Sequence, residues 1–116
     1  MATDNPQKAL LHGTLDTLIL RTLAAGPRHG YGIATDIEDR SGEAVLIEDG
    51  SLYPALYRLE HQGLIDAEWG DSDNNRKAKY YTLTTAGRRR LKEETASWNQ
   101  LTSAVASVLD ATAEEI

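Results

Sequence analysis

The sequence contains no cysteine, and this excludes a disulfide framework, a thiolate metal site and a cysteine nucleophile. It also lacks a run of about 18 apolar residues, so we expect no membrane-spanning helix. The first dozen residues have neither the charged start nor the apolar middle of a signal peptide. These absences together predict a cytoplasmic protein that has no contact with a membrane.

Patterns typical of catalytic and metal-binding sites are missing as well. The three histidines, His12, His29 and His61, lie far apart in the sequence, whereas metal sites use short ligand spacings. No nucleophile motif, phosphate-cradling glycine loop or pair of catalytic carboxylates is present. We therefore expect no enzyme activity, no cofactor and no metal site.

Positive charge is absent from the end of the chain and concentrated just before it. Residues 93–116 hold five acids and no Lys or Arg, residues 63–92 hold seven bases against four acids, and residues 1–62 hold five bases against nine acids. The net charge of −6 argues against a protein that binds polyanions through charge alone. The basic segment is either a solvated face or a local contact for a polyanion.

The remaining composition is that of one folded domain, because 116 residues with 41% hydrophobic and 26% charged residues support a single modest core. Apolar residues at three- and four-residue spacing predict a first helix that begins at Thr14, its cap. A second helix is expected over residues 31–40, with Tyr31, Ala34 and Ile37 buried.

The segment before the third helix, residues 45–47, is a short apolar run that predicts a small strand or an extended connection. The third helix is expected to begin near Ser51, with its cap among residues 49–51, because proline is tolerated in a first turn and Pro54 follows shortly. Gly63 is expected to end this helix. Its expected inner face is formed by Leu52, Leu56 and Leu59.

The next segment changes to the two-residue period of a β-hairpin. Ile65, Ala67 and Trp69 alternate with Asp66 and Glu68, which predicts a half-buried strand. Residues 70–75 are rich in Gly, Asp, Ser and Asn and predict a turn. Residues 79–83 return as a second strand, rich in aromatic and β-branched side chains.

Three helices followed by a β-hairpin is the chain order of a winged helix-turn-helix, in which the third helix enters the major groove of DNA and the hairpin, or wing, reaches the backbone. The predicted class is therefore mainly α (α+β), with a long C-terminal dimerisation helix. The expected divisions are a flexible arm at residues 1–9, a DNA-binding domain at residues 10–83, the dimerisation helix at residues 84–109 and a frayed tail at residues 110–116.

The final helix, capped by Thr84 or Thr85, carries a seam of apolar residues at coiled-coil spacing. The seam comprises Leu91, Trp98, Leu101, Val105 and Val108. A helix of this length, about 39 Å at 1.5 Å per residue, is too long for a core of this size to cover. Trp98 is therefore either an anchor of a dimer interface or, paired across a two-fold axis, a stacking platform for a planar aromatic ligand.

Two groups of side chains are candidate DNA contacts, because amides, hydroxyls and bases near a helix N-terminus bind phosphates and base edges. The third helix contributes Ser51, Tyr53, Pro54, Tyr57 and Arg58. The wing contributes Asn74, Asn75, Arg76, Lys77 and Lys79. Structural alternatives stay open: a cap for the serine, packing on the wing for the tyrosines, turn geometry for the asparagines. Arg58 could also pair with Glu60 or with an acid of the second helix.

Several motifs in this order resemble those of PadR-type transcriptional regulators. Residues 29–33 read HGYGI and are similar to the start of that family's second helix, and residues 50–60 read GSLYPALYRLE and are similar to its recognition-helix signature. The resemblance covers about residues 10–109 and continues through GLI at residues 63–65, WG at 69–70, RKAKYYTLT at 76–84 and GR at 87–88.

The resemblance implies a homodimeric, ligand-responsive regulator that binds double-stranded operator DNA, is usually a repressor and dimerises through the final helix. In one multidrug-binding branch of the family, a tryptophan at the place of Trp98 stacks on the ligand. A small planar aromatic effector is therefore a candidate partner. Two other interpretations stay open: a winged helix that binds only a protein, and a ligand sensor that does not bind DNA.

Overall fold

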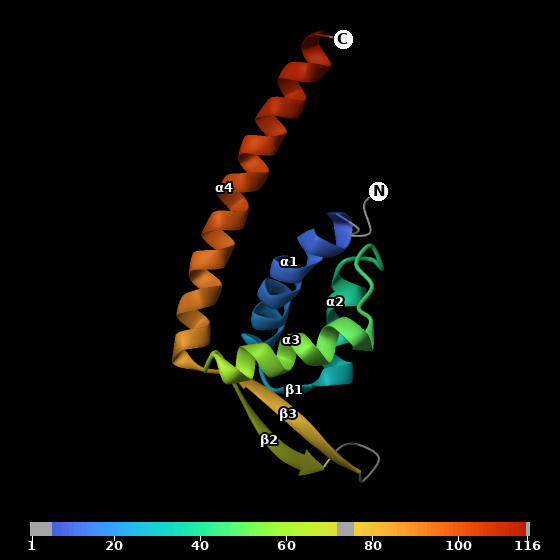
Figure 1. Ribbon diagram of the computed structural model, residues 1–116, viewed down its shortest axis with the longest axis vertical. Coiled ribbons are helices and arrows are strands. Elements are labelled where there is room, and N and C mark those ends of the chain that lie inside the picture. Colours follow the sequence, from blue (N-terminus) through green and yellow to red (C-terminus); the bar gives the residue numbers. More distant parts are fainter. Residues whose placement is uncertain (1–5, 72–75, 116) are drawn as a thin grey trace.

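The computed structural model describes the backbone of residues 6–71 and 76–115 and the side chains of residues 13–71 and 76–110. Three helices and a small sheet form a body from which a last long helix projects (Figure 1). The elements in chain order are α1 (Pro6–Leu23), β1 (Arg28–His29), α2 (Gly30–Arg40), α3 (Asp49–His61), β2 (Ile65–Asp71), β3 (Lys77–Leu83) and α4 (Thr85–Glu115).

The sheet is antiparallel with the strand order β1-β3-β2. The wing hairpin pairs Ile65 of β2 with Leu83 of β3, and β1 adds a third strand by pairing Arg28 with Tyr81. The predicted winged-helix fold is thereby confirmed, with one strand more than expected. A strand of two residues is too short to show an alternating pattern, and residues 45–47 form a connection without a strand.

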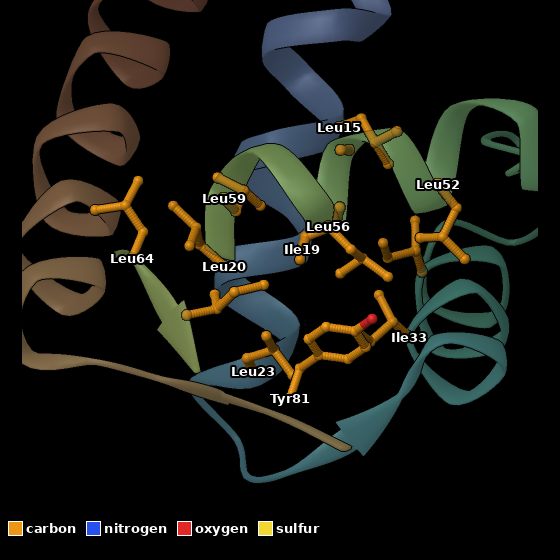
Figure 2. Packing of buried hydrophobic residues seen from close by; sticks show 13 residues of the cluster. Leu15, Ile19, Leu20, Leu23, Ile33, Leu52, Leu56, Leu59, Leu64 and Tyr81 are labelled. Carbon is orange, nitrogen blue, oxygen red and sulfur yellow. The ribbon is translucent and has the colours of Figure 1, made fainter. Parts of the chain in front are cut away.

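The core lies where the three short helices meet the sheet. Its buried residues are Leu15, Ile19, Leu20, Leu23, Ile33, Ile37, Leu52, Ala55, Leu56, Leu59, Leu64, Ile65 and Tyr81. Figure 2 shows Leu56 and Leu59 of α3 lying against Ile19 and Leu20 of α1, with Tyr81 of the sheet beneath them. Each buried aliphatic side chain stabilises the fold by about 1.5–3 kcal/mol, so this packing also fixes the orientation of α3.

The first helix begins earlier than predicted. It starts at Pro6 and not at Thr14, so residues 6–9, expected in the arm, are helical. The sequence before Thr14 explains the difference, because Ala, Leu, Gln and Lys favour helix and proline is favoured at the first helical position.

The second helix turns a different face to the core than predicted. Ile33 and Ile37 are buried, whereas Tyr31 is 75% exposed, so the prediction of a buried Tyr31 was wrong. The helix begins at Gly30 because the His29 side chain caps it: the Gly32 N–H donates to His29 Nδ1 at 3.0 Å. Ile33 and Ile37 share the face that packs on the core, and at about 100° per residue Tyr31 lies on the other side of the helix.

The last helix is anchored at its first turn and then leaves the body. Thr84 caps it as predicted, since its hydroxyl oxygen accepts from the Gly87 N–H at 3.0 Å. A β-carbon at Gly87 would overlap the carbonyl oxygen of Leu64, so only glycine permits this close approach. Leu91 still packs against the core, but every residue from 92 to 110 is exposed. The helix continues to Glu115, beyond its expected end at residue 109.

Candidate nucleic-acid interface

The outward face of α3 is determined by the residues that it buries. The inner face consists of Leu52, Ala55, Leu56 and Leu59, each 0–1% exposed, which confirms the prediction for the three leucines. Tyr53, Pro54 and Tyr57 therefore face solvent, and Tyr57 keeps 63% of its surface accessible. Ser51 is half-buried in the first turn. The outward face thus offers aromatic rings and hydroxyls to a partner.

The start of α3 differs from the prediction in its cap. The cap residue is Glu48, and its carbonyl oxygen accepts from the Ser51 N–H at 2.9 Å. The helix begins at Asp49, which places Pro54 beyond the first turn. Proline has no N–H, so the carbonyl of Gly50 receives no helical hydrogen bond from it.

The Arg58 side chain is held by α1. Its Nη2 atom lies 2.6 Å from Oδ1 of Asp16, a charge-assisted hydrogen bond between two partly exposed groups. The expected structural partners, Glu60 or an acid of the second helix, were wrong, because the partner is on the first helix. The pair ties the middle of α3 to α1, and a DNA contact by Arg58 stays a prediction.

The bases of the wing lie beside acids. Lys79 Nζ is 3.4 Å from Glu60 Oε1 and 5.9 Å from the centre of the Tyr81 ring, and Lys77 Nζ is 3.4 Å from Asp71 Oδ1. Arg76 is exposed, and the predicted contacts Asn74 and Asn75 lie outside the described residues. The wing therefore brings Lys77 and Lys79 to one sheet, each with an acid that a phosphate would have to replace.

Burial also perturbs a phenol at the base of the wing. It raises the pKa of Tyr81 above the ordinary value of a tyrosine, the nearby Lys79 opposes this shift, and Glu60 and Tyr53 add to it. Tyr81 is thus neutral at physiological pH and contributes packing rather than charge.

The sequence pattern did not identify three residues near the wing as part of the molecular surface. Tyr31 was expected to be buried, and Trp69 was expected among the apolar residues of a half-buried strand. Trp69 is instead 67% exposed, because β2 extends beyond the edge of the core. Arg28, in β1, lies beside them along one groove. Tyr53 of α3 reaches the same place: its ring covers the backbone of Gly30, where a β-carbon would lie 2.8 Å from Tyr53 Cε1. No local pattern in the sequence predicts that β1, α2, α3 and β2 meet at this groove.

The apolar seam of α4 divides into two parts. Leu91 is partly buried against the core, so it belongs to the body of the monomer. The exposed fraction is 48% for Trp98, 53% for Leu101, 47% for Val105 and 65% for Val108. These four residues form an uncovered apolar face, which we call the α4 seam.

The sequence model of the transcriptional regulator PadR-like family matches residues 19–93. The chain belongs to this family. The matched part of the PadR-like chain runs from α1 through α3 and the wing into the start of α4. It ends before Trp98, so the α4 seam lies outside it.

Individual relatives agree with this assignment. An uncharacterised protein of Lysinibacillus sphaericus is 34% identical over 92 residues, which cover 79% of this chain and 84% of that protein. The crystal structure of a PadR family transcriptional regulator from Eggerthella lenta is 36% identical with a TM-score of 0.73, covering 89% of this chain and 88% of the other. That of a PadR-like regulator from Bacillus cereus is 30% identical with a TM-score of 0.75, covering 87% and 96%.

As a PadR-like protein, the chain is a DNA-binding regulator of transcription and not an enzyme. Within the part of the chain that the structure describes, no helix combines the length and apolarity that crossing a membrane requires. Over the same residues, no three His, Cys, Asp or Glu side chains gather closely enough to hold a metal ion.

Proposed function

We propose that this PadR-like protein is a cytoplasmic homodimer that represses transcription and responds to a small planar aromatic effector. The observation that carries the proposal is the α4 seam, in which Trp98, Leu101, Val105 and Val108 remain 47–65% exposed on a helix beyond the body. Contiguous apolar surface of this kind marks an interaction site. Its coiled-coil spacing favours a second helix of the same kind as its partner.

The length of α4 supports this assignment. Its 31 residues span roughly 46 Å at 1.5 Å per residue, while the body covers the helix only as far as Leu91. A two-fold axis that crosses the seam would let each copy cover the other with the same residues, as in isologous dimers. The apolar side chains of the α4 seam, which are exposed in the monomer, would then be buried in the dimer.

In this proposal α3 enters the major groove with Ser51, Tyr53, Pro54, Tyr57 and Arg58 toward DNA. Arg76, Lys77 and Lys79 of the wing contact flanking phosphates, together with Asn74 and Asn75. A dimer presents two such units and reads half-sites separated by one helical turn or a multiple of it. Occupation of DNA that overlaps a promoter excludes the polymerase, which is sufficient for repression.

The effector would bind where the two copies of Trp98 face each other. Two indoles across a two-fold axis can stack on both faces of a planar guest. A guest that prefers one spacing of the two subunits shifts the population toward that spacing. The distance between the two copies of α3, and with it the affinity for DNA, changes as a result.

Sedimentation velocity tests the dimer. We expect the wild type to sediment as a dimer and Leu101→Asp, which places a charge in the seam, as a folded monomer. Ser103→Asp is the matched control, because residue 103 lies on the face of α4 opposite the seam, and it should remain dimeric. A wild type that stays monomeric at all concentrations would overturn the proposal.

A gel shift with the DNA upstream of the protein's own gene tests repression by operator binding. The wild type should shift this DNA at low salt and progressively less as salt rises, and Leu101→Asp should bind far more weakly because only one α3 can engage. No shift at low salt would instead favour a winged helix that binds a protein.

Tryptophan fluorescence tests the effector site. Planar cationic compounds should quench the emission of the wild type and of Trp69→Ala, but not that of Trp98→Ala. If the quenching survives the loss of Trp98 and disappears with Trp69, the platform at the two-fold axis is wrong.

A further inference from the structure

We propose that Glu94 gives the effector site on α4 a negative charge and thereby selects a planar aromatic cation as the ligand. The carboxylate would lie beside the ring of Trp98 and pair with the positive charge of the ligand. This inference rests on the proposed stacking platform at Trp98 and adds to it the residue that determines which charge the ligand carries. We call these two residues, together with their copies in the dimer, the Glu94–Trp98 site.

Glu94 interrupts the apolar spacing of α4. The positions that advance by three and four residues in turn along this helix are Leu91, Glu94, Trp98, Leu101, Val105 and Val108. At about 100° per residue, Glu94 lies within about 40° of Trp98 around the helix axis, and it is exposed like the α4 seam itself. Departures from a local pattern are expected where function requires them. The carboxylate therefore belongs to the face that we propose is covered in the dimer.

The carboxylate of Glu94 has no base as its partner in the described part of the chain, because neither Arg90 nor any other base there forms an ion pair with it. Arg90 precedes Glu94 by four residues, which is the weaker orientation for such a pair on a helix. It is also one turn further from Trp98 than Glu94 is. On the other side of Glu94, residues 95–109 contain no charged side chain. Glu94 therefore sets the sign of the charge at Trp98.

A carboxylate inside an apolar interface favours a cation as the ligand. Burying a carboxylate without a partner is costly, and a second copy that packs on this face brings either the uncharged residues 95–109 or the partner's Glu94. A planar cation would satisfy both groups of the site, because the face of the indole attracts positive charge and the carboxylate pairs with it. A planar anion would be repelled, and a neutral ring would leave the carboxylate unpaired.

Fluorescence titration with two dyes of one ring system tests this selection. Proflavine is a planar cation, whereas acridine has the same fused rings and is neutral at mildly alkaline pH. Both are titrated into Trp69→Ala, in which Trp98 is the remaining tryptophan. Proflavine should bind about five- to tenfold more tightly than acridine, the range of one partly buried ion pair. Glu94→Gln in the same background should lose this preference, because it binds proflavine more weakly and acridine no less tightly.

Glu93→Gln is the matched control. It removes the same charge from the adjacent residue, which is also exposed but lies about 100° around the helix from Glu94. This variant should keep the preference for proflavine. If Glu93→Gln and Glu94→Gln lose the preference equally, only the net charge of α4 matters and the inference is wrong.

Sedimentation equilibrium of the dimer supplies a second readout, which needs no dye. Glu94→Gln should lower the dissociation constant of the dimer several-fold, because an unpaired carboxylate no longer has to be buried, whereas Glu93→Gln should leave it unchanged. Proflavine should tighten the dimer of the wild type, since a ligand held by two copies stabilises their association. A dissociation constant that Glu94→Gln leaves unchanged or raises would overturn the placement of this carboxylate in the interface.

The outcomes separate this inference from the proposed function. If proflavine and acridine bind equally well and Trp98→Ala abolishes the binding of both, the platform at Trp98 stands and the role of Glu94 is wrong. A preference for proflavine that remains in Glu94→Gln would likewise overturn the role of Glu94 alone. If the wild type is a dimer that binds neither dye, the effector site and its selection of a cation are both overturned, while the dimer remains.

Discussion

The helices α3 and α4 carry apolar residues at similar spacing, but the chain covers only one of them. On α3, Leu52, Leu56 and Leu59 are each 1% exposed, whereas on α4 Trp98 and Leu101 keep 48% and 53% of their surface. The difference arises because α3 crosses α1 and the sheet, while α4 leaves the body after its first two turns (Figure 1). Helical periodicity indicates which residues share a face, and the rest of the fold decides whether that face is covered.

The largest expected difference between the two helices is in stability. Leu59→Ala opens a cavity in the core and should lower the free energy of unfolding by about 2–5 kcal/mol. Leu101→Ala, the same change on α4, should alter the unfolding of the body by less than about 0.5 kcal/mol. Hydrogen exchange of the α3 amides measures the body alone. Equal losses in the two variants would mean that the isolated chain already covers α4.

The next effect concerns the point where α4 joins the body. Gly87→Ala places a β-carbon on the carbonyl of Leu64 and should destabilise the protein by about 1–3 kcal/mol. Gly13→Ala is the control, since nothing lies within 4 Å of a β-carbon there, and alanine inside α1 should stabilise by about 0.5–1 kcal/mol. In thermal unfolding, the midpoint temperature should thus fall for Gly87→Ala and rise for Gly13→Ala. A Gly87→Ala midpoint at or above that of the wild type would contradict the close contact.

A smaller effect is expected from the acids of the two helices. Glu60 of α3 lies 3.4 Å from the ammonium of Lys79, so Glu60→Gln frees this charge for DNA. The affinity for a duplex should rise about two- to fivefold, the range expected for a partly exposed ion pair. Glu93→Gln, which removes an exposed acid from α4, should change it less. If anisotropy titrations show the same gain in duplex affinity for Glu60→Gln and Glu93→Gln, the change in net charge alone explains the effect.

The smallest effect is the pH dependence that Tyr81 confers. Because burial raises the pKa of Tyr81 in the folded state, its stabilising contribution is complete below the pKa of an exposed tyrosine, about 10. It is lost as the pH rises through the higher folded-state value. Urea unfolding above about pH 10 should show a shallower decline of stability in Tyr81→Phe than in the wild type. Tyr57→Phe, which removes an exposed hydroxyl, should follow the wild type.

The sequence pattern was sufficient for the winged-helix fold and for the inner face of α3. It failed at Tyr31 because α2 packs the face of Ile33 and Ile37 on the core, and Tyr31 lies on the other side of the helix. It failed at Trp69 because alternation predicts the side of a strand and not how far the core extends along it. Both errors concern residues that line the groove between α2 and the wing.

The ion pairs of the candidate site could not be predicted from local sequence. Asp16 and Arg58 are 42 residues apart in the chain, and Glu60 meets Lys79 only because the wing folds back along the end of α3. Such contacts depend on how whole elements pack. The α4 seam was the opposite case, since its spacing and the length of the helix were enough to predict an uncovered face.

The anchor of α4 has a mechanical consequence. The Thr84 hydroxyl donates to the carbonyl of Gly63 at 2.8 Å, and the Thr84 N–H donates to that of Leu64 at 3.2 Å. These carbonyls belong to the turn that ends α3, so α4 is anchored beside the helix that we propose enters the major groove. A tilt of about 10° at Gly87 displaces the far end of α4 by about 7 Å, given its rise of 1.5 Å per residue. A force applied near the tip of α4 would therefore exert a torque on its junction with the end of α3, and this torque grows with the distance of the force from Gly87.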